Sequence, residues 1–228
     1  MPRKCTILFD LDGTLIDSTE AILKSFEDSF GHFGLETPPH EKIKALIGHP
    51  LDYMYLHLGI PEERVWDFVE VYKSYYRERS KPMTHLLPGA KEAIAEAARF
   101  ARLGVVTTKT GLYSKILLEH MGVMSRFEVL IGREDVVHPK PSPEPILKAL
   151  HAMQIEDPSD VWMVGDTCLD MVSAKDAGIE GVGVLSGYAT KEELARCSPF
   201  LRNDALEAVR LIREFKKKLK LSRNNLKL

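Results

Sequence analysis

The stretch Phe9-Asp10-Leu11-Asp12-Gly13-Thr14-Leu15 decides the fold, because it follows the apolar run Thr6 to Phe9 and ends it in a glycine turn. Two carboxylates therefore stand close together where a buried strand meets a turn. Ligands of open α/β sheets bind at the carboxyl ends of the strands, so this pair indicates a functional site. The same sequence also suits an ordinary strand-to-turn connection, and the motif alone leaves both interpretations open.

Short β-rich apolar runs recur along the chain, with helical stretches between them. The predicted strands are Thr6 to Phe9, Val105 to Thr107, Val129 to Ile131, Val161 to Val164 and Val182 to Leu185. Apolar residues have helical spacing in Ala90 to Ala101, Leu112 to Met121, Pro145 to Met153 and Asp170 to Ala177. Ser142-Pro143 is typical of an N-cap followed by a first-turn proline. The alternation predicts an α/β fold, with a Rossmann-like parallel sheet between helices.

Residues 16–84 break this alternation, because several helical patterns follow one another without a convincing strand. We interpret them as a helical-bundle cap inserted after the first strand. Residues 1–15 and 85–228 are then the catalytic core, to which Pro88-Gly89 marks the return.

The ends of this cap carry recognisable signals. Its first helix is expected to begin at Asp17, with Glu20 reaching back as a capping box. Its last helix is expected to run from Glu62 through a series of aromatic residues. These aromatics are expected to form the core of the bundle: Trp66, Phe68, Tyr72, Tyr75 and Tyr76.

The composition is that of an ordinary globular protein, with 44% hydrophobic and 28% charged residues among 228. The net charge of −2 gives no general attraction to nucleic acid or to an anionic membrane surface, so an anionic substrate must be held locally. The apolar run before Asp10 is too short for a signal peptide or a membrane span. Composition does not distinguish a monomer from a homodimer.

Two further features bear on the environment of the protein. Cys5, Cys168 and Cys197 match neither a disulfide framework nor a zinc pattern, so we expect reduced thiols and a cytoplasmic location. The basic segment Lys216 to Leu221 is interpreted as a solvated helix end with a frayed tail, rather than as a basic binding arm.

A second acidic cluster follows the fourth predicted strand, in Val164-Gly165-Asp166-Thr167-Cys168-Leu169-Asp170. Crowded carboxylates repel one another, so a hard divalent cation is their expected partner. Mg²⁺ prefers oxygen ligands, and Asp10 and Asp166 together can offer them. The ion then keeps coordination positions for a substrate phosphate. No set of histidines and cysteines competes for zinc. We therefore expect Mg²⁺ as the cofactor.

Two other strand ends supply groups that can hold an anion. Val106-Thr107-Thr108-Lys109-Thr110-Gly111 offers hydroxyl and N–H groups near a helix start, which suits either an anion or a plain N-cap. Lys140 lies between prolines after the third predicted strand. Since prolines restrict the backbone there, we interpret Lys140 as a fixed counter-charge to phosphate and carboxylate.

Four motifs at the ends of successive predicted strands resemble the signatures of the haloacid-dehalogenase superfamily. Asp10-Leu11-Asp12-Gly13-Thr14 resembles the first, Thr107 the second, Lys140 the third and Gly165-Asp166-x-x-x-Asp170 the fourth. The stretch from Phe9 to Ser18, the run Lys140 to Pro145 and the helical insertion are similar to the phosphoglycolate-phosphatase-like branch, which carries a helical cap. The sequence departs from many members of that branch at Thr108, where they have asparagine.

The resemblance implies a role for each matching residue. Asp10 is the nucleophile, and Asp12 protonates the leaving oxygen and then activates water. Thr107 and Lys140 hold the phosphoryl group, and Thr108 lies near the substrate.

The resemblance also implies the metal ligands. Mg²⁺ is bound by Asp10, by the backbone carbonyl of Asp12 and by Asp166. Asp170 is either a further ligand or a partner of the ligands. The cap closes over the sheet edge and reads the rest of the substrate, with His49 in Gly48-His49-Pro50 either a substrate contact or a solvent-facing turn residue. Arg133 is interpreted as a structural residue that pairs with Glu134 or Asp135.

The predicted function is therefore a phosphatase for a small organic phosphomonoester, with 2-phosphoglycolate the first substrate to test. Pyrophosphate and sugar or nucleotide phosphates are alternatives, and a phosphomutase is a second enzyme class on the same scaffold. A dehalogenase attacks carbon and needs neither the metal-binding carboxylates nor Asp12. A regulatory protein without catalysis is disfavoured, because the whole set of reactive residues is present.

Overall fold

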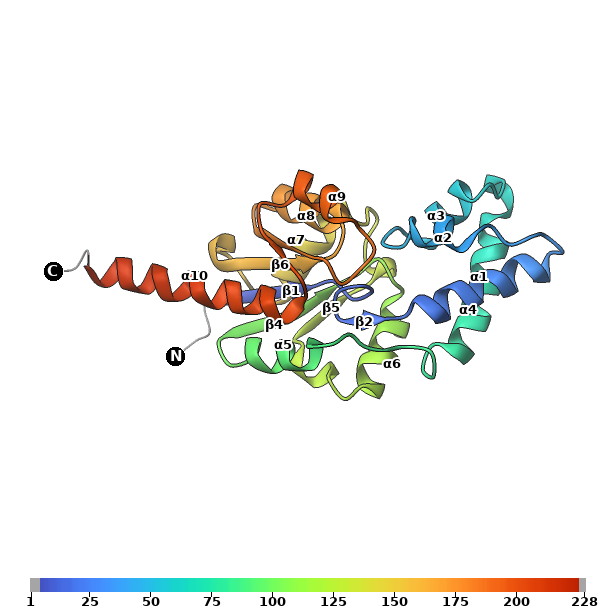
Figure 1. The fold of residues 1–228 in the computed structure, drawn as a ribbon. Helices are drawn as coiled ribbons and strands as arrows, with labels where there is room; N and C mark the ends of the chain where they lie inside the picture. Colours follow the sequence, from blue (N-terminus) through green and yellow to red (C-terminus); the bar gives the residue numbers. More distant parts are fainter. Residues whose placement is uncertain (1–4, 226–228) are drawn as a thin grey trace.

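The computed structural model describes residues 5–225, and the side chains of residues 5–218. Its centre is a parallel sheet with the strand order β5-β4-β1-β6-β7-β8 (Figure 1). The strands are β1 (Cys5–Phe9), β4 (Ala101–Val106), β5 (Val129–Ile131), β6 (Val161–Gly165), β7 (Glu180–Val184) and β8 (Leu201–Arg202). The predicted α/β fold is confirmed, and β8 is an addition to the predicted strands.

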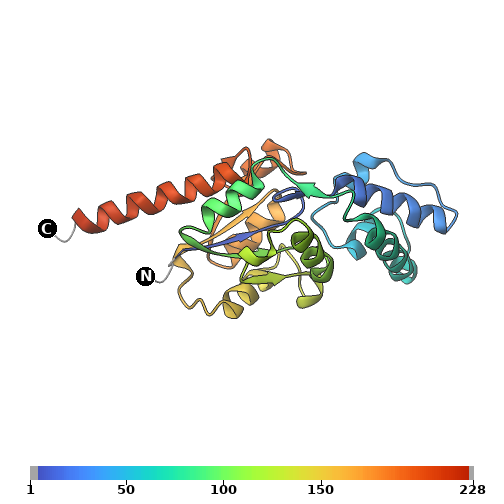
Figure 2. The ribbon, with the colours of Figure 1, turned by 90° about the horizontal axis from the view of Figure 1, so that it is seen from below.

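Helices cover both faces of the sheet. Both faces need such cover, because successive apolar residues of the central strand point to opposite faces. Ile7 and Phe9 join the apolar cluster under one face, and Leu8 joins the cluster under the other. The first face carries α5 (Ala90–Ala97), α6 (Gly111–His120) and α10 (Ala205–Asn225). The second carries α7 (Glu144–Ala152) and α8 (Cys168–Asp176), with α9 (Lys191–Cys197) packed on α8 (Figures 1 and 2).

Several predicted boundaries in this layer differ from the observed ones by one to four residues, and two of them have a clear cause. Ala101 was expected to end a helix but begins β4, because β4 pairs with the whole of β1, from Ala101 opposite Cys5 to Val105 opposite Phe9. The helix α7 begins at Glu144, one residue later than the Ser142-Pro143 signal predicted. Ser142 still contributes, since its Oγ accepts a hydrogen bond from the Glu144 backbone N–H at 3.2 Å.

The remaining helices form a separate unit, which we call the helical unit. It contains α1 (Thr19–His32), α2 (His40–Lys44), α3 (Leu51–His57) and α4 (Val65–Arg79). Short 3₁₀ turns occur here at Glu62–Arg64, and in the sheet layer at Met124–Arg126, Arg133–Asp135 and Pro158–Asp160. Figures 1 and 2 both show the unit beside the sheet, at the end opposite to α10.

The helical unit has its own aromatic core. Phe26, Tyr55, Phe68 and Tyr72 are buried against one another, with ring centroids 4.8 Å apart for Phe26 and Tyr55. Trp66 was expected in this core but is 59% exposed, because it lies on the opposite side of α4 from Phe68 and Tyr72. The other aromatics of the predicted series are buried or half-buried.

The start of α1 differs from its prediction. The helix begins at Thr19 rather than Asp17, and Asp17 instead accepts a hydrogen bond from the Thr19 backbone N–H at 2.9 Å. Ser18, the N-cap residue, makes no capping bond, because its hydroxyl donates to the carboxylate of Asp12. The predicted capping box is therefore absent, and the cap position is used to hold a residue of the candidate site.

The chain passes between the sheet layer and the helical unit twice, at neighbouring places. The short strands β2 (Ile16–Asp17) and β3 (His85–Leu86) pair antiparallel there. The Leu87 backbone N–H donates to the Leu15 carbonyl at 3.0 Å and extends the pairing by one bond. The two connections between the sheet layer and the helical unit are therefore joined to each other by backbone hydrogen bonds.

The prediction of three reduced thiols is wrong for two of them. A disulfide joins Cys168, the first residue of α8, to Cys197, the last residue of α9. The two helices pack side by side and bring these distant positions together. Cys5 is free and buried in β1.

The C-terminal segment Lys216 to Leu221 belongs to α10, which continues to Asn225. Lys216 forms an ion pair with Asp160. The frayed tail expected beyond this segment would include residues 226–228, which lie outside the described residues. Within the part of the chain that the structure describes, no helix is both long and apolar enough to cross a membrane.

Candidate active site

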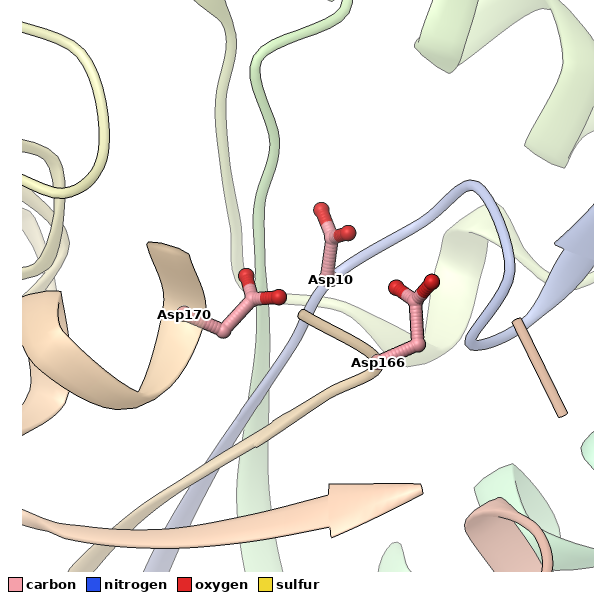
Figure 3. A group of neighbouring side chains, drawn as sticks. All are labelled: Asp10, Asp166 and Asp170. Carbon is pink, nitrogen blue, oxygen red and sulfur yellow. The ribbon is translucent and has the colours of Figure 1, made fainter. Parts of the chain in front are cut away.

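Three buried carboxylates converge at the carboxyl edge of the sheet. Asp10 directly follows β1, Asp166 directly follows β6, and Asp170 lies in the first turn of α8. One oxygen from each lies within 4.8 Å of the others, and Figure 3 shows the side chains pointing toward one another. The two acidic motifs that the sequence placed at separate strand ends therefore meet in one cluster.

Lys140 joins this cluster from the loop before α7. Its Nζ lies 2.8 Å from Asp10 Oδ1 and 2.5 Å from Asp170 Oδ1, and it also donates to the Val106 carbonyl at 3.1 Å. Burial alone would lower the pKa of Lys140, but the two carboxylates outweigh burial and raise the pKa above its usual value. The side chain is therefore a fixed positive charge beside Asp10.

Asp166 and Asp170 are held by their neighbours. Thr14 donates to Asp166 Oδ1 at 3.2 Å, and the Tyr188 backbone N–H donates to Asp166 Oδ2 at 2.8 Å. Thr167 donates to Asp170 Oδ2 through its N–H at 3.1 Å and through its hydroxyl at 2.8 Å. Since Asp170 also accepts from Lys140 through Oδ1, both of its oxygens are bound by protein groups.

Glycine is required where the backbone passes Asp166. A Cβ atom on Gly187 would lie 1.9 Å from Asp166 Oδ2, and one on Gly13 would lie 2.4 Å from the same atom. Gly13 also has a φ of +79°, a conformation that residues with side chains rarely adopt. The backbone therefore packs closely around this carboxylate.

The cluster carries more negative than positive charge. Burial raises the pKa of Asp10 to about 7, against the opposing effect of Lys140 and with a further increase from Asp170. Burial, together with Asp10 and Asp170, also raises the pKa of Asp166. A divalent cation would relieve this repulsion, and a set of carboxylate oxygens is the donor set that Mg²⁺ prefers. These residues fit a magnesium ion.

The two threonines after β4 occupy different surroundings. Thr107 is buried at the sheet edge, where its hydroxyl accepts from the Lys109 backbone N–H at 3.2 Å. The Thr108 hydroxyl donates to the Gly48 carbonyl at 2.8 Å, so it connects the sheet edge to the loop between α2 and α3. At the position where the family resemblance led us to expect asparagine, this chain therefore makes a contact to the helical unit.

His49 follows Gly48 in that loop and is half-buried. Its ring stacks on Tyr53, with centroids 4.1 Å apart. Burial, with a smaller effect of His57, lowers the pKa of His49 below its usual value, so the ring is neutral near pH 7. His49 lines a cavity together with Asp12 and Thr108, which places it between the helical unit and the sheet edge.

Lys109 is a residue that the sequence prediction missed. Its Nζ lies 2.9 and 3.1 Å from the two carboxylate oxygens of Asp12 and 4.7 Å from the ring centroid of Tyr76. The side chain is only 9% exposed. A lysine in a strand-to-helix loop, at the same sheet edge as two carboxylates, was the available signal. Asp12 is thus held by Lys109 and Ser18, apart from the cluster around Lys140.

Arg133 has a different partner from the one predicted. Its guanidinium lies 3.7 Å from Asp52 in α3 and donates to the Val136 carbonyl at 3.2 Å. The two predicted partners are engaged elsewhere, since Glu134 accepts from the N–H groups of Gly111 and Leu112 and Asp135 accepts from that of Gly132. Arg133 therefore forms an ion pair between the sheet layer and the helical unit.

Comparison with known proteins gives one consistent family. Residues 7–184 match the model of the haloacid dehalogenase-like hydrolases. The chain is 34% identical to "Probable phosphatase IndB" of Dickeya dadantii, covering 90% of this chain and 92% of that one. It is 33% identical to pyrophosphatase PpaX of Bacillus velezensis, covering 87% and 95% of the two chains. It is 30% identical to phosphoglycolate phosphatase of Yersinia pseudotuberculosis, covering 85% and 86%.

A solved structure agrees with these sequence relationships. The crystal structure of a predicted phosphatase from Clostridium acetobutylicum superposes with a TM-score of 0.85 at 25% identity, covering 93% of this chain and all of that one. The relatives carry the names of phosphatases, and the geometry places the four sequence motifs at one sheet edge. The chain therefore belongs to the haloacid dehalogenase-like hydrolase family, as its motifs predicted.

Proposed function

We propose that the protein is a Mg²⁺-dependent phosphatase that hydrolyses a small organic phosphomonoester through an aspartyl-phosphate intermediate. The observation that carries this proposal is Asp10, a buried carboxylate at the end of the central strand, with Lys140 Nζ at 2.8 Å and Asp166 in the same cluster. A carboxylate in this setting can attack phosphorus while a fixed cation balances its charge.

The reaction divides between the two carboxylates of the first motif. An Asp10 oxygen forms a bond to phosphorus, and the bond from phosphorus to the ester oxygen breaks. Asp12 gives a proton to the departing oxygen, which leaves as the alcohol. Asp12 then takes a proton from water as the water oxygen attacks phosphorus, so that inorganic phosphate leaves and Asp10 is regenerated.

The other residues hold the phosphoryl group and the metal. Thr107 and Lys140 contact the phosphoryl oxygens, and Mg²⁺ is bound by Asp10, Asp166 and the backbone carbonyl of Asp12. A bound Mg²⁺ supplies charge stabilisation for the transferred phosphoryl group. Asp170, whose two oxygens are taken by Lys140 and Thr167, positions Lys140 rather than binding the ion directly.

Residues 16–84 are proposed to act as a cap that excludes water from this edge and contacts the alcohol part of the substrate. Residues 1–15 and 85–228 are proposed to form the catalytic core. His49 and Thr108 belong to the contact between the two, and His49 is proposed to meet the substrate directly.

The first ester to test is 2-phosphoglycolate, since one relative is named a phosphoglycolate phosphatase. Pyrophosphate is the alternative, because another relative is named a pyrophosphatase. Sugar and nucleotide phosphates follow, and analysis of the products would separate hydrolysis from a phosphomutase reaction. We also propose that the protein acts on a small phosphate ester rather than on nucleic acid. A cytoplasmic location stays a proposal, and the Cys168–Cys197 disulfide removes the argument for it from reduced thiols.

The test is the release of phosphate from a panel of these esters, with Mg²⁺ or with EDTA. Wild-type turnover is expected to require Mg²⁺, and Asp10→Asn is expected to lower kcat by at least about a thousandfold while the fold is retained. Asp176→Asn, an exposed carboxylate on α8, is the matched control and should leave kcat unchanged. Metal-free hydrolysis at the wild-type rate, or full activity of Asp10→Asn, would contradict the proposal.

A further inference from the structure

A cavity of about 250 Å³ lies between the helical unit and the sheet edge. On the sheet side it is lined by Asp12, Thr108 and Lys109, and on the other side by residues of α1, α3 and α4. In the proposed reaction Asp12 protonates the oxygen of the departing alcohol. The remainder of that alcohol must then lie beyond Asp12, which is where the cavity begins.

The size of the cavity exceeds what a two-carbon alcohol needs. A protein cavity of about 150 Å³ accommodates a benzene molecule. At about 250 Å³, the cavity has room for a ring together with a short chain that connects the ring to the ester oxygen. A glycolate group would leave most of this space to be filled by water against apolar walls.

The walls contributed by the helical unit are mainly apolar. Their apolar part consists of Ile22, Ile47, Leu51, Met54, Val69 and Tyr72, and the same unit also contributes the polar side chains of His49, Asp52 and Lys73. Most of these residues are buried members of the same cluster that forms the core of the unit. Apolar walls of this kind stabilise a ligand mainly by removing its apolar surface from water.

The cations at the cavity are already paired with carboxylates. Arg133 pairs with Asp52, Lys109 with Asp12, and Lys73 with Glu70 at 2.9 Å. His49, which also lines the cavity, is neutral because burial lowers its pKa. A carboxylate on the alcohol would therefore have to compete with Asp12, Asp52 or Glu70 for a counter-charge, and without one its burial against the apolar walls is unfavourable.

We propose that the preferred substrate is a phosphomonoester of an uncharged alcohol that carries an aromatic ring. The inference rests on the proposed function and narrows its substrate class. The cleaved bond joins phosphorus to the ester oxygen, so one water molecule converts the ester into this alcohol and inorganic phosphate. Esters of small or anionic alcohols, including 2-phosphoglycolate, are poorer substrates.

The first experiment compares kcat/KM for 2-phenylethyl phosphate, ethyl phosphate and 2-phosphoglycolate in the presence of Mg²⁺. All three are esters of primary alcohols, so the comparison reports mainly on the cavity rather than on the ease of bond cleavage. The phenylethyl ester is expected to exceed each of the others by at least about tenfold, as burial of a ring-sized apolar group allows. Equal values, or a preference for 2-phosphoglycolate, would overturn the inference.

The second experiment fills the cavity. Leu51→Trp places a large ring in the wall at the start of α3, and it is expected to lower the phenylethyl-to-ethyl ratio of kcat/KM at least about fivefold. Leu56→Trp is the matched control, since Leu56 lies on the same helix, is 43% exposed and lies outside the lining. It should leave the ratio unchanged. If both variants lower the phenylethyl-to-ethyl ratio equally, the phenyl ring of the substrate does not bind in this cavity.

A binding measurement separates this inference from the proposed function. Calorimetry with Mg²⁺ compares 3-phenylpropylphosphonate with propylphosphonate, two analogues that cannot be hydrolysed. The ring-bearing analogue is expected to bind at least about tenfold more tightly to the wild type and to lose this advantage in Leu51→Trp. Tight binding without turnover of any ester would contradict the proposed function alone. Turnover without the ring preference would contradict the inference alone.

Discussion

At the scale of single residues, Lys109 fixes the orientation of the Asp12 side chain. Two hydrogen bonds from Lys109 Nζ hold both carboxylate oxygens of Asp12, and the ring of Tyr76 lies against the ammonium group. Because a proton donor must point at the departing oxygen, this pair bears on the step that releases the alcohol. The effect of Lys109 should therefore depend on how much protonation the alcohol requires.

We predict that Lys109→Met lowers kcat about ten- to hundredfold on an alkyl phosphate and changes KM much less. The loss should be far smaller on 4-nitrophenyl phosphate, whose departing group needs no proton. Lys115→Met, on α6 with a side chain that is 60% exposed, is the control and should leave kcat at the wild-type value. Steady-state kinetics on both substrates measures the difference. Equal losses on the two would show that Lys109 does not orient Asp12.

Sequence reasoning located Asp10, Asp12, Lys140 and Asp166 at one sheet edge because strand ends are readable from apolar runs and turn residues. The side-chain directions were not readable in the same way. Lys109 lies in the motif that follows the second predicted strand, yet only the folded chain shows that it reaches Asp12 rather than solvent. The roles of all these residues stay predictions until variants are measured.

At the scale of elements, the apolar runs predicted the existence of five strands, because each run is bounded by turn or polar residues, but not all of their bounds. The boundary between α5 and β4 was wrong, since the Ala-rich segment before Ala101 suits a helix and only pairing with β1 extends the strand. The strand β8 contains just Leu201 and Arg202, and two residues are too few to show the alternation of apolar and polar residues by which a strand is recognised. Tertiary contacts decided both cases.

The disulfide between α8 and α9 belongs to the same scale, since wide spacing in the sequence concealed it. We predict that alkylation of the native protein without reductant labels no cysteine, because Cys5 is buried and the other two are joined. Unfolding should expose one thiol, and unfolding with reductant should expose three. Mass spectrometry of the intact protein counts the labels. Three labels without reductant would contradict the assignment.

Removal of this disulfide should also weaken the packing of α9 on α8. Cys197→Ser is expected to lower the free energy of unfolding by about 2–4 kcal/mol, as for other disulfides that close loops of similar length. The measurement is urea denaturation with and without reductant. Reductant should destabilise the wild type to a similar degree and should not affect the variant.

At the scale of the whole molecule, composition predicted a globular protein, and the break in alternation indicated a helical insertion. Neither could predict the contacts between the helical unit and the sheet layer. Arg133 with Asp52, and Thr108 with the Gly48 carbonyl, join residues that are far apart in the sequence. Such contacts depend on the relative placement of two folded parts.

These contacts lead to a kinetic prediction. Arg133→Met removes the ion pair to α3 and is expected to raise KM severalfold, because the helical unit then covers the sheet edge for less of the time. Arg102→Met, which removes an ion pair with Glu128 in the sheet layer, is the control. Small-angle X-ray scattering should show a larger radius of gyration for Arg133→Met than for the control. If KM and the radius of gyration are both unchanged, the ion pair between Arg133 and Asp52 does not help to hold the helical unit over the sheet edge.

The pairing of β2 with β3 joins the two chain connections between the helical unit and the sheet layer into one two-stranded linker. The other contacts described between the two parts, Arg133 with Asp52 and Thr108 with the Gly48 carbonyl, are side-chain contacts that can break without disturbing this backbone pairing. We therefore expect any movement of the helical unit to be a rotation about this pair of strands. If the proposed function is correct, such a rotation would uncover the sheet edge, so that the ester could enter and the alcohol could leave on the same side of the molecule.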